Sequence, residues 1–298
     1  MRIQRLFDRQ RRAVFLSDAR KCVVQPFKQR RRAAPVFLFG TQRSGTSMIM
    51  YAFHMHPDTT VFDEHRNSVA FKDFQIRDFK KIDGLIQTSR TAFCCFKPIC
   101  DSHRIHDFLT HFPACKAIWA YRDFRPVALS RLKKFGNATK AIRQVCTGSG
   151  NGGWFEDGLS PYTLEVLRDI YSQKLSDMDL SCLVWWARNQ IFVEKRLSES
   201  DRITIVNYET LARSPESELA WVFSRLGLDQ SGRCARFINA SSITSPSITL
   251  TPAVEALCEQ TLEHLHAAYH RQRGACTTGD TAPAASQSAL DRVVPPSS

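Results

Sequence analysis

Short apolar runs that alternate with helical segments are the feature that most constrains the fold of this chain of 298 residues. The runs have the length and composition of buried strands and lie at 35–40, 91–97, 116–123 and 202–209. Segments with helical spacing follow them, at 45–54, 102–112, 125–136 and 214–228. This order predicts an α/β fold of three layers, in which helices flank a central parallel sheet.

The same patterns predict three parts in the chain. Residues 1–33 form a basic N-terminal arm, residues 34–273 form one domain, and residues 274–298, rich in Ala, Ser, Thr and Pro, form a disordered tail. Within the domain, residues 137–160 are rich in Gly, Asn and Ser and predict a long loop or a mobile insert. Further helices are expected near 161–174, 179–198 and 252–271, and Ser214 is the expected N-cap of the helix before the last one.

The chain carries a formal net charge of +12, which favours anionic partners. Nucleic acid is not expected among them, because aromatic residues do not interleave with the basic clusters and no zinc-finger or RNP signature occurs. The ten cysteines are scattered without a C-x-x-C pair, so neither a metal site nor a redox motif is predicted.

Hydropathy predicts no transmembrane anchor, since no run of about 18 uncharged apolar residues occurs. The N-terminal sequence MRIQRLFDRQRRAVF carries charges throughout and lacks the apolar centre of a signal peptide. These observations predict a cytoplasmic protein. Golgi or membrane association is the alternative, because a basic arm is either solvated or in contact with an acidic membrane.

The stretch FLFGTQRSGTS has the outline of a phosphate-binding loop between a strand and a helix. In a P-loop NTPase, however, the position of Thr46 carries a lysine, and the only cation of this loop is Arg43. Hydroxyl groups and a helix N-terminus complete an anion site around Arg43 without that lysine. The predicted anion-binding residues are Thr41, Gln42, Arg43, Ser44, Gly45, Thr46 and Ser47.

A second anion-binding element is predicted in RDFRPVALS, where Arg122 follows a strand and Ser130 lies eight residues later on a helix. Ligands of open α/β sheets bind at the carboxyl ends of the strands, where this pair is placed to bind a second phosphate. A surface arginine beside a helical serine is the alternative interpretation when this element is taken alone.

Together the two elements resemble the motifs of the sulfotransferases that use 3′-phosphoadenylyl sulfate (PAPS). TQRSGTS is similar to the family motif [PQ]-[KR]-S-G-T-[ST], and RDFRPVALS has the spacing of R-[DN]-x-R-x-x-x-x-S. HPDTTVFDE, FKP and the segment beginning IVNYETLARSP are similar to passages of the Golgi-type and bacterial branch, which includes the tyrosylprotein sulfotransferases. The resemblance extends from about residue 35 to about residue 250 and implies a P-loop-NTPase-like fold and PAPS as cosubstrate, with no required metal.

The resemblance also implies roles for individual residues. It places the catalytic base on Glu64, with Asp63 as the second candidate, and the cation that stabilises the leaving phosphate on Lys97. Lys97 stands directly before Pro98, whereas the family passage K-x-P has one residue between them. The 5′-phosphosulfate is assigned to Arg43 and its loop.

The 3′-phosphate is assigned by the resemblance to Arg122 and Ser130, and Tyr208 corresponds to a tyrosine that contacts the cofactor. A serine near the bridging oxygen is placed on Ser242, chosen among Ser241, Ser242 and Ser245.

The expected activity is sulfuryl transfer from PAPS to a hydroxyl or amine acceptor, with adenosine 3′,5′-bisphosphate as by-product. The acceptor stays open among a glycan, a protein tyrosine, a lipid and a small alcohol, and so does the oligomeric state. The stretch GSGNGGWFEDG is expected to shape the acceptor pocket, and Arg66 either orients an acidic acceptor or forms a surface salt bridge. A degenerate P-loop kinase or NTPase and a non-catalytic polyanion-binding protein are the alternative functions.

Overall fold

The computed structural model describes residues 2–25, 33–149, 152–171, 174–229, 232–238, 240, 243 and 246–277. Its central sheet is entirely parallel. In spatial order, the strands of that sheet are β2 (Thr59–Phe62), β5 (Phe93–Phe96), β1 (Ala34–Gly40), β6 (Lys116–Tyr121) and β7 (Ile203–Asn207). A separate antiparallel hairpin pairs β3 (Phe71–Lys72) with β4 (Gln75–Ile76).

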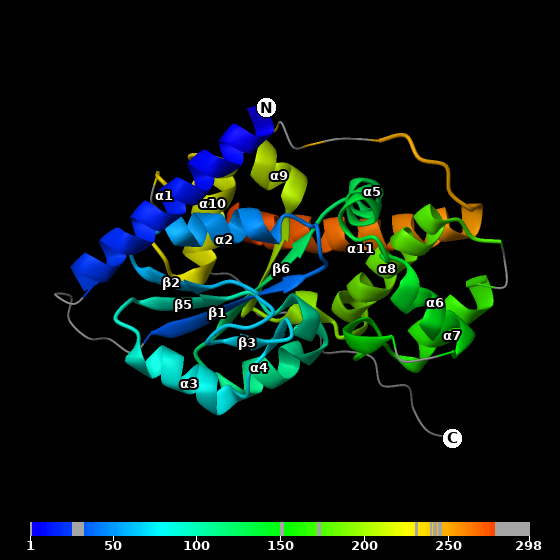
Figure 1. Ribbon diagram of the computed structural model, residues 1–298, viewed down its shortest axis with the longest axis horizontal. Coiled ribbons are helices and arrows are strands. Elements are labelled where there is room, and N and C mark those ends of the chain that lie inside the picture. Colours follow the sequence, from blue (N-terminus) through cyan, green and yellow to red (C-terminus); the bar gives the residue numbers. More distant parts are fainter. Residues whose placement is uncertain are drawn as a thin grey trace, which may run out of the picture.

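Helices cover both faces of the sheet, which confirms the predicted α/β fold of three layers (Figure 1). Above the sheet in that view lie α1 (Arg2–Val24) and α2 (Thr46–Met55), and below it lie α3 (Phe79–Thr88) and α4 (Ile105–His111). The other α-helices are α5 (Phe124–Lys134), α6 (Lys140–Thr147), α7 (Pro161–Tyr171), α8 (Asp177–Glu194), α9 (Tyr208–Arg213), α10 (Pro215–Leu226) and α11 (Pro252–Thr277). Short 3-10 helices are η2 (Ile99–Arg104), η3 (Gly153–Phe155) and η4 (Leu197–Glu199).

The core between the sheet and its helices is rich in aromatic side chains. Phe37 of β1 is fully buried, and its ring centroid lies 5.3 Å from that of Phe96 and 4.7 Å from that of Phe108. Trp119 of β6 is also fully buried and donates its indole N–H to Asn189 Oδ1 at 3.2 Å. Full burial of each such side chain contributes roughly 2–3 kcal/mol, which explains why these strands need uninterrupted apolar sequence.

The carboxyl ends of β1 and β6 lie next to each other where the connections of the chain diverge. From β1 the chain continues through α2 to β2 on one side, and from β6 it leads to β7 on the other side. Gly40 ends β1 with a φ of 130°, and a Cβ atom there would lie 2.2 Å from the carbonyl oxygen of Ala120 in β6. Only glycine permits this close approach, and open α/β sheets bind their ligands at such a point.

The prediction of a long loop or mobile insert at 137–160 is wrong for much of that stretch. Residues 140–147 form α6, whose side chains Ile142 and Val145 are buried against the neighbouring helices. After it, η3 is held by Arg188 of α8, whose Nη1 donates to the carbonyl oxygens of Trp154, Phe155 and Asp157. The apolar residues of α6 have helical spacing, but glycine, asparagine and serine on both sides obscured it.

The described part of the basic arm is a helix that packs on the domain. Ser17 Oγ of α1 donates to the carbonyl oxygen of His54 at 2.8 Å, and Lys21 Nζ donates to that of Phe53 at 3.4 Å. Lys21 is only 7% exposed, so its charge lies in the contact between α1 and α2.

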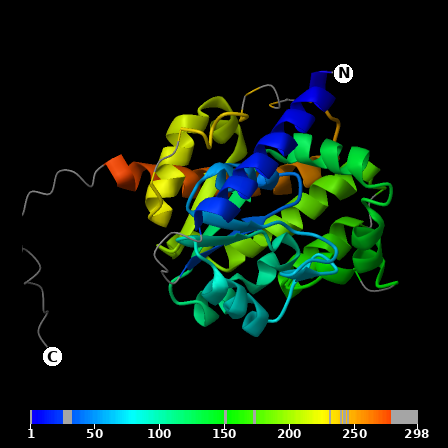
Figure 2. The same cartoon turned by 60° about the vertical axis from the view of Figure 1, so that its left-hand side comes forward.

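The start of α10 lies where it was predicted, but the end of the last helix does not. Ser214 is the N-cap residue of α10 but makes no side-chain cap hydrogen bond, although Pro215 begins the helix as expected. The last helix, α11, packs against α8 and β7 and reaches Thr277, beyond the predicted end of the domain (Figure 2). The rest of the predicted tail, residues 278–298, lies outside the described residues.

Candidate active site

The loop between β1 and α2 has the conformation of an anion-binding turn. The buried hydroxyl groups of Thr41 and Ser44 are hydrogen-bonded at 2.5 Å and fix its base. Gly45 is the N-cap of α2 with a φ of 80° and makes no side-chain cap, so the first N–H groups of the helix are available to a ligand. Arg43 has a φ of 70°, a left-handed conformation that costs free energy in a non-glycine residue.

The two predicted anion-binding elements meet at this loop. Arg43 Nε donates to Ser130 Oγ of α5 at 2.9 Å, although 87 residues separate them in the chain. Burial and the nearby charge of Arg122 lower the pKa of Arg43. Both guanidinium groups follow carboxyl ends of adjacent strands, and their mutual repulsion is expected of a site that binds a polyanion.

Tyr208, the first residue of α9 after β7, joins the two elements. Its ring lies under the guanidinium of Arg122, with 4.0 Å from Cζ to the ring centroid, and it also covers Gly45. The indole N–H of Trp185 donates to the carbonyl oxygen of Arg122 at 2.9 Å and holds the end of β6 in place. Trp185 itself is fully buried. Arg122 Nε also lies 3.8 Å from Glu209 Oε1.

Asp63 and Glu64 follow β2 and have different environments. Although burial opposes it, hydrogen bonding from His54 and the charge of Lys97 hold the pKa of Asp63 below its ordinary value. Asp63 Oδ2 lies 2.8 Å from His54 Nε2, and its Oδ1 lies 3.9 Å from Lys97 Nζ. In Glu64, burial raises the pKa against the opposing effects of Lys97 and Cys100. Glu64 Oε1 is buried and has no hydrogen-bond partner in the described part of the chain.

Two cavities open on either side of Glu64. The first, here called the insert-side cavity, has a volume of about 570 Å³ and is bounded by the phosphate-binding loop, α5, α6 and η3. The second, the α1-side cavity, has a volume of about 610 Å³ and lies between α1, α2 and the segment after β2. Both are lined by Ser47, Glu64 and Lys97, so these three residues lie where the two cavities meet.

The remaining sequence predictions have mixed outcomes. Arg66 is 78% exposed, lies 3.8 Å from Asp73 in a surface salt bridge and lines neither cavity. Ser242 and its alternatives, Ser241 and Ser245, lie outside the described residues. Trp154 and Phe155, from the stretch expected to shape the acceptor pocket, line the insert-side cavity.

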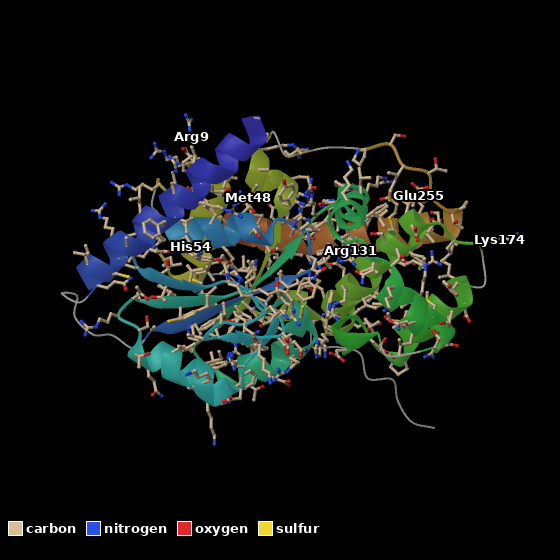
Figure 3. All side chains as sticks on the ribbon, in the orientation of Figure 1. Arg9, Met48, His54, Arg131, Lys174 and Glu255 are labelled. Atoms are coloured by element: carbon tan, nitrogen blue, oxygen red, sulfur yellow. The ribbon has the colours of Figure 1, made fainter. Side chains whose placement is uncertain are left out.

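Two residues of the site carried no motif in the sequence. His54 lies between Asp18 of α1 and Asp63, with ring nitrogens 2.9 and 2.8 Å from their carboxylates (Figure 3). Arg131 of α5 donates from Nη1 to Gln42 Oε1 of the loop at 2.8 Å and lines the insert-side cavity. In the sequence, the only indication that Arg131 belongs to the site is its position next to Ser130. Consecutive residues of a helix point in different directions, so the sequence alone does not pair Arg131 with Gln42.

The described residues contain no group of three or more His, Cys, Asp or Glu side chains placed to hold a metal ion. Among the helices that the structure describes, none is both long and apolar enough to cross a membrane.

Comparison with known proteins gives one family match. A family model described as a sulfotransferase domain matches residues 33–264. No curated protein sequence matches the chain.

Similar solved structures include the sulfotransferase domain of the Synechococcus PCC 7002 olefin synthase, at 14% identity and a TM-score of 0.43, covering 79% of this chain and 98% of that one. A sulfotransferase from Alicyclobacillus acidocaldarius is similar at 15% identity and a TM-score of 0.45, with 80% and 96% covered. Mouse sulfotransferase SULT7A1, solved with PAP, is similar at 13% identity and a TM-score of 0.45, with 86% and 92% covered.

Proposed function

Because the chain belongs to the sulfotransferase family, we propose that it transfers a sulfuryl group from PAPS to a hydroxyl or amine acceptor and releases adenosine 3′,5′-bisphosphate. The observation that carries the proposal is the meeting of Arg43, Ser130 and Arg122 around one loop. A nucleotide with phosphates at both its 3′ and 5′ positions needs two separate anion-binding groups, and this arrangement supplies both.

The donor would be held along the carboxyl ends of β1 and β6. We assign its 5′-phosphosulfate to Arg43 and to the loop residues Thr41, Gln42, Ser44, Gly45, Thr46 and Ser47. Arg122 and Ser130 would bind the 3′-phosphate, and the ring of Tyr208 would hold Arg122 in position. We retain Ser242 as a prediction for a serine near the bridging oxygen.

In the proposed reaction, the acceptor oxygen or nitrogen forms a bond to sulfur while the bond from sulfur to the phosphate oxygen breaks. Glu64 accepts the proton of the acceptor, and a raised pKa suits it to this role near neutral pH. Lys97, whose side chain is 12% exposed, stabilises the negative charge that develops on the leaving phosphate. Asp63 is the weaker candidate for the base, because His54 already occupies one of its oxygens.

A transfer assay tests this proposal. The protein is incubated with labelled PAPS and a panel of hydroxyl and amine acceptors that spans glycans, tyrosine peptides, lipids and small alcohols, and labelled products are identified. Transfer to at least one class is expected, without a requirement for added metal. Nucleotide hydrolysis with ATP and Mg²⁺ would instead support a P-loop kinase or NTPase, and salt-sensitive polyanion binding without transfer would support a binding protein. We propose the cytoplasm as the compartment, to be checked by fractionation.

A further inference from the structure

The insert-side cavity begins at the sulfuryl end of the proposed donor site and leads away from the 3′-phosphate. It is lined by Arg43, Glu64 and Lys97, but its lining includes neither Arg122 nor Ser130. The cavity therefore offers the acceptor a space of about 570 Å³ in front of the proposed base. This volume suits a small molecule or a side chain rather than a large polymer.

Arg131 of α5, labelled in Figure 3, is a buried cation. It lies in the wall of this cavity. Arg131 is 6% exposed, and among the described residues its Nε has no hydrogen-bond partner and no carboxylate forms an ion pair with it. Burial alone lowers the pKa of Arg131 to about 10. Arg188 is also buried, but the negative charges of Asp101 and Asp157 act on it, whereas no acidic group in the described part of the chain acts on Arg131.

A buried charge without a partner of opposite sign lowers the stability of the folded protein. Among the described residues, Arg131 donates to Gln42 Oε1 at 2.8 Å and, weakly, to the carbonyl oxygen of Ala138 at 3.4 Å, and its Cζ lies 5.8 Å from the ring centroid of Phe135. Both acceptors are neutral, so the guanidinium keeps an unsatisfied preference for an anion. A ligand anion in the cavity would offset this cost.

The charged residues that line the cavity are also mostly cations. Its charged lining comprises Arg43, Lys97, Arg131 and Lys140 against Glu64 alone. In the proposed function, Arg43 and Lys97 are occupied by the phosphosulfate. Arg131 at the wall and the exposed Lys140 at the start of α6 then remain for the acceptor.

Most of the remaining wall is apolar. Phe74 comes from the hairpin of β3 and β4, Phe135 follows α5, and Trp154 and Phe155 come from η3. Aromatic side chains from three separate parts of the chain therefore enclose a space that has cations at one side. Such a wall favours a flat or ring-bearing apolar body.

We propose that the acceptor is an apolar, ring-bearing molecule or side chain that carries an anionic group, and that Arg131 and Lys140 bind this group. The inference rests on the proposed function, because the acceptor hydroxyl or amine must face Glu64 while the anion faces α5 and α6. Arg131 and Lys140 thereby determine specificity without taking part in the transfer.

A pair of fluorescent probes tests the inference without any transfer step. 8-Anilinonaphthalene-1-sulfonate and N-phenyl-1-naphthylamine share one ring skeleton and differ by the sulfonate. Both are titrated against the full chain in the presence of adenosine 3′,5′-bisphosphate, for the wild type and for Lys140→Ala and Arg131→Gln. Lys133→Ala is the matched control, because Lys133 is an exposed lysine of α5 outside the cavity lining.

The wild type should bind the sulfonate at least tenfold more tightly than the neutral probe. Lys140→Ala and Arg131→Gln should each reduce this ratio by about tenfold, the size expected for one charge-assisted contact, and Lys133→Ala should leave it unchanged. Equal affinity for the two probes, or a ratio that survives both substitutions, would overturn the inference. Because Lys140 is exposed, Lys140→Ala should fold normally, and its affinity ratio tests the inference even if Arg131→Gln fails to fold. Absence of nucleotide binding by calorimetry would instead count against the proposed function.

Discussion

Replacement of Gly45 by alanine tests how the phosphate-binding loop and the start of α9 depend on each other. Gly45 has a φ of 80°, and a Cβ atom there would lie 2.1 Å from Cδ2 of the Tyr208 ring. Carbon atoms in contact are about 3.5–4 Å apart, so the ring must retreat by about 1.5 Å or the loop must move. The guanidinium of Arg122 lies over the same ring, with its Cζ 4.0 Å from the centroid, and would lose its support.

The expected cost has two parts. A left-handed conformation costs a residue with a Cβ atom about 1–2 kcal/mol, and overpacking against Tyr208 adds about 1–3 kcal/mol to the loss of folding stability. Displacement of Arg122 should remove one charge-assisted contact with the proposed nucleotide, worth about 1.5–3 kcal/mol. That loss corresponds to a weakening of nucleotide affinity by about 10- to 100-fold.

Calorimetric titration with adenosine 3′,5′-bisphosphate measures the affinity, and thermal denaturation measures the stability. The matched control is Gly84→Ala in α3, where a Cβ atom would meet nothing within 4 Å. This control should raise stability by about 0.5–1 kcal/mol and leave nucleotide affinity unchanged. If Gly45→Ala bound the nucleotide within twofold of the wild type, the proposed link between the loop, Tyr208 and Arg122 would be refuted.

Further predictions concern the base, the 3′-phosphate and the helix α1. Glu64→Gln should lower turnover by about 100-fold or more without loss of calorimetric nucleotide binding, and near-normal turnover would remove Glu64 from the mechanism. Since burial raises the pKa of Glu64 and the base acts when deprotonated, kcat/KM should fall with decreasing pH through a pKa above the ordinary 4.5; a limb at or below that value would contradict this assignment. Arg122→Ala should abolish the calorimetric preference for adenosine 3′,5′-bisphosphate over adenosine 5′-monophosphate, and a retained preference would place the 3′-phosphate elsewhere. Burial lowers the pKa of His54, but hydrogen bonds to Asp18 and Asp63 outweigh burial and raise this pKa from 6.5 to about 9. These hydrogen bonds stabilise the packing of α1 on the domain. Their contribution is fully present below pH 6.5 and is lost as the pH rises through about 9. Hydrogen-exchange protection of α1 should therefore fall above about pH 9 in the wild type but not in His54→Gln, and equal protection at about pH 7 and 10 would contradict this.

The central sheet was predictable because its strands are buried on both faces. The runs that contain β1, β5, β6 and β7 have more consecutive apolar residues than a strand with one solvent-facing side would have. Each of these strands lies at its predicted position. The edge strand β2 was not predicted, because it has four residues and only Thr59 among them is buried. Short edge strands have little hydrophobic pattern to detect.

In the candidate site, motif spacing indicated that Arg43 and Ser130 lie close together. It did not indicate which contacts hold the residues of the site in position. Arg43 and Ser130 are in direct contact, although they belong to separate motifs. The interaction of His54 with Asp18 and the burial of Arg131 depend on packing between helices that no local pattern encodes. The same limit applies to the insert, where the anchoring contacts of Arg188 come from a distant helix.

The contact between α1 and α2 shows which residues a fragment that retains the candidate site must include. The family match starts at residue 33, but a fragment cut there would lack Asp18, which shares the His54 ring with Asp63 next to the proposed base. It would also open the wall of the α1-side cavity that Arg11, Val14 and Phe15 provide. The smallest portion of this protein suitable for enzymology therefore begins upstream of the boundary that homology marks.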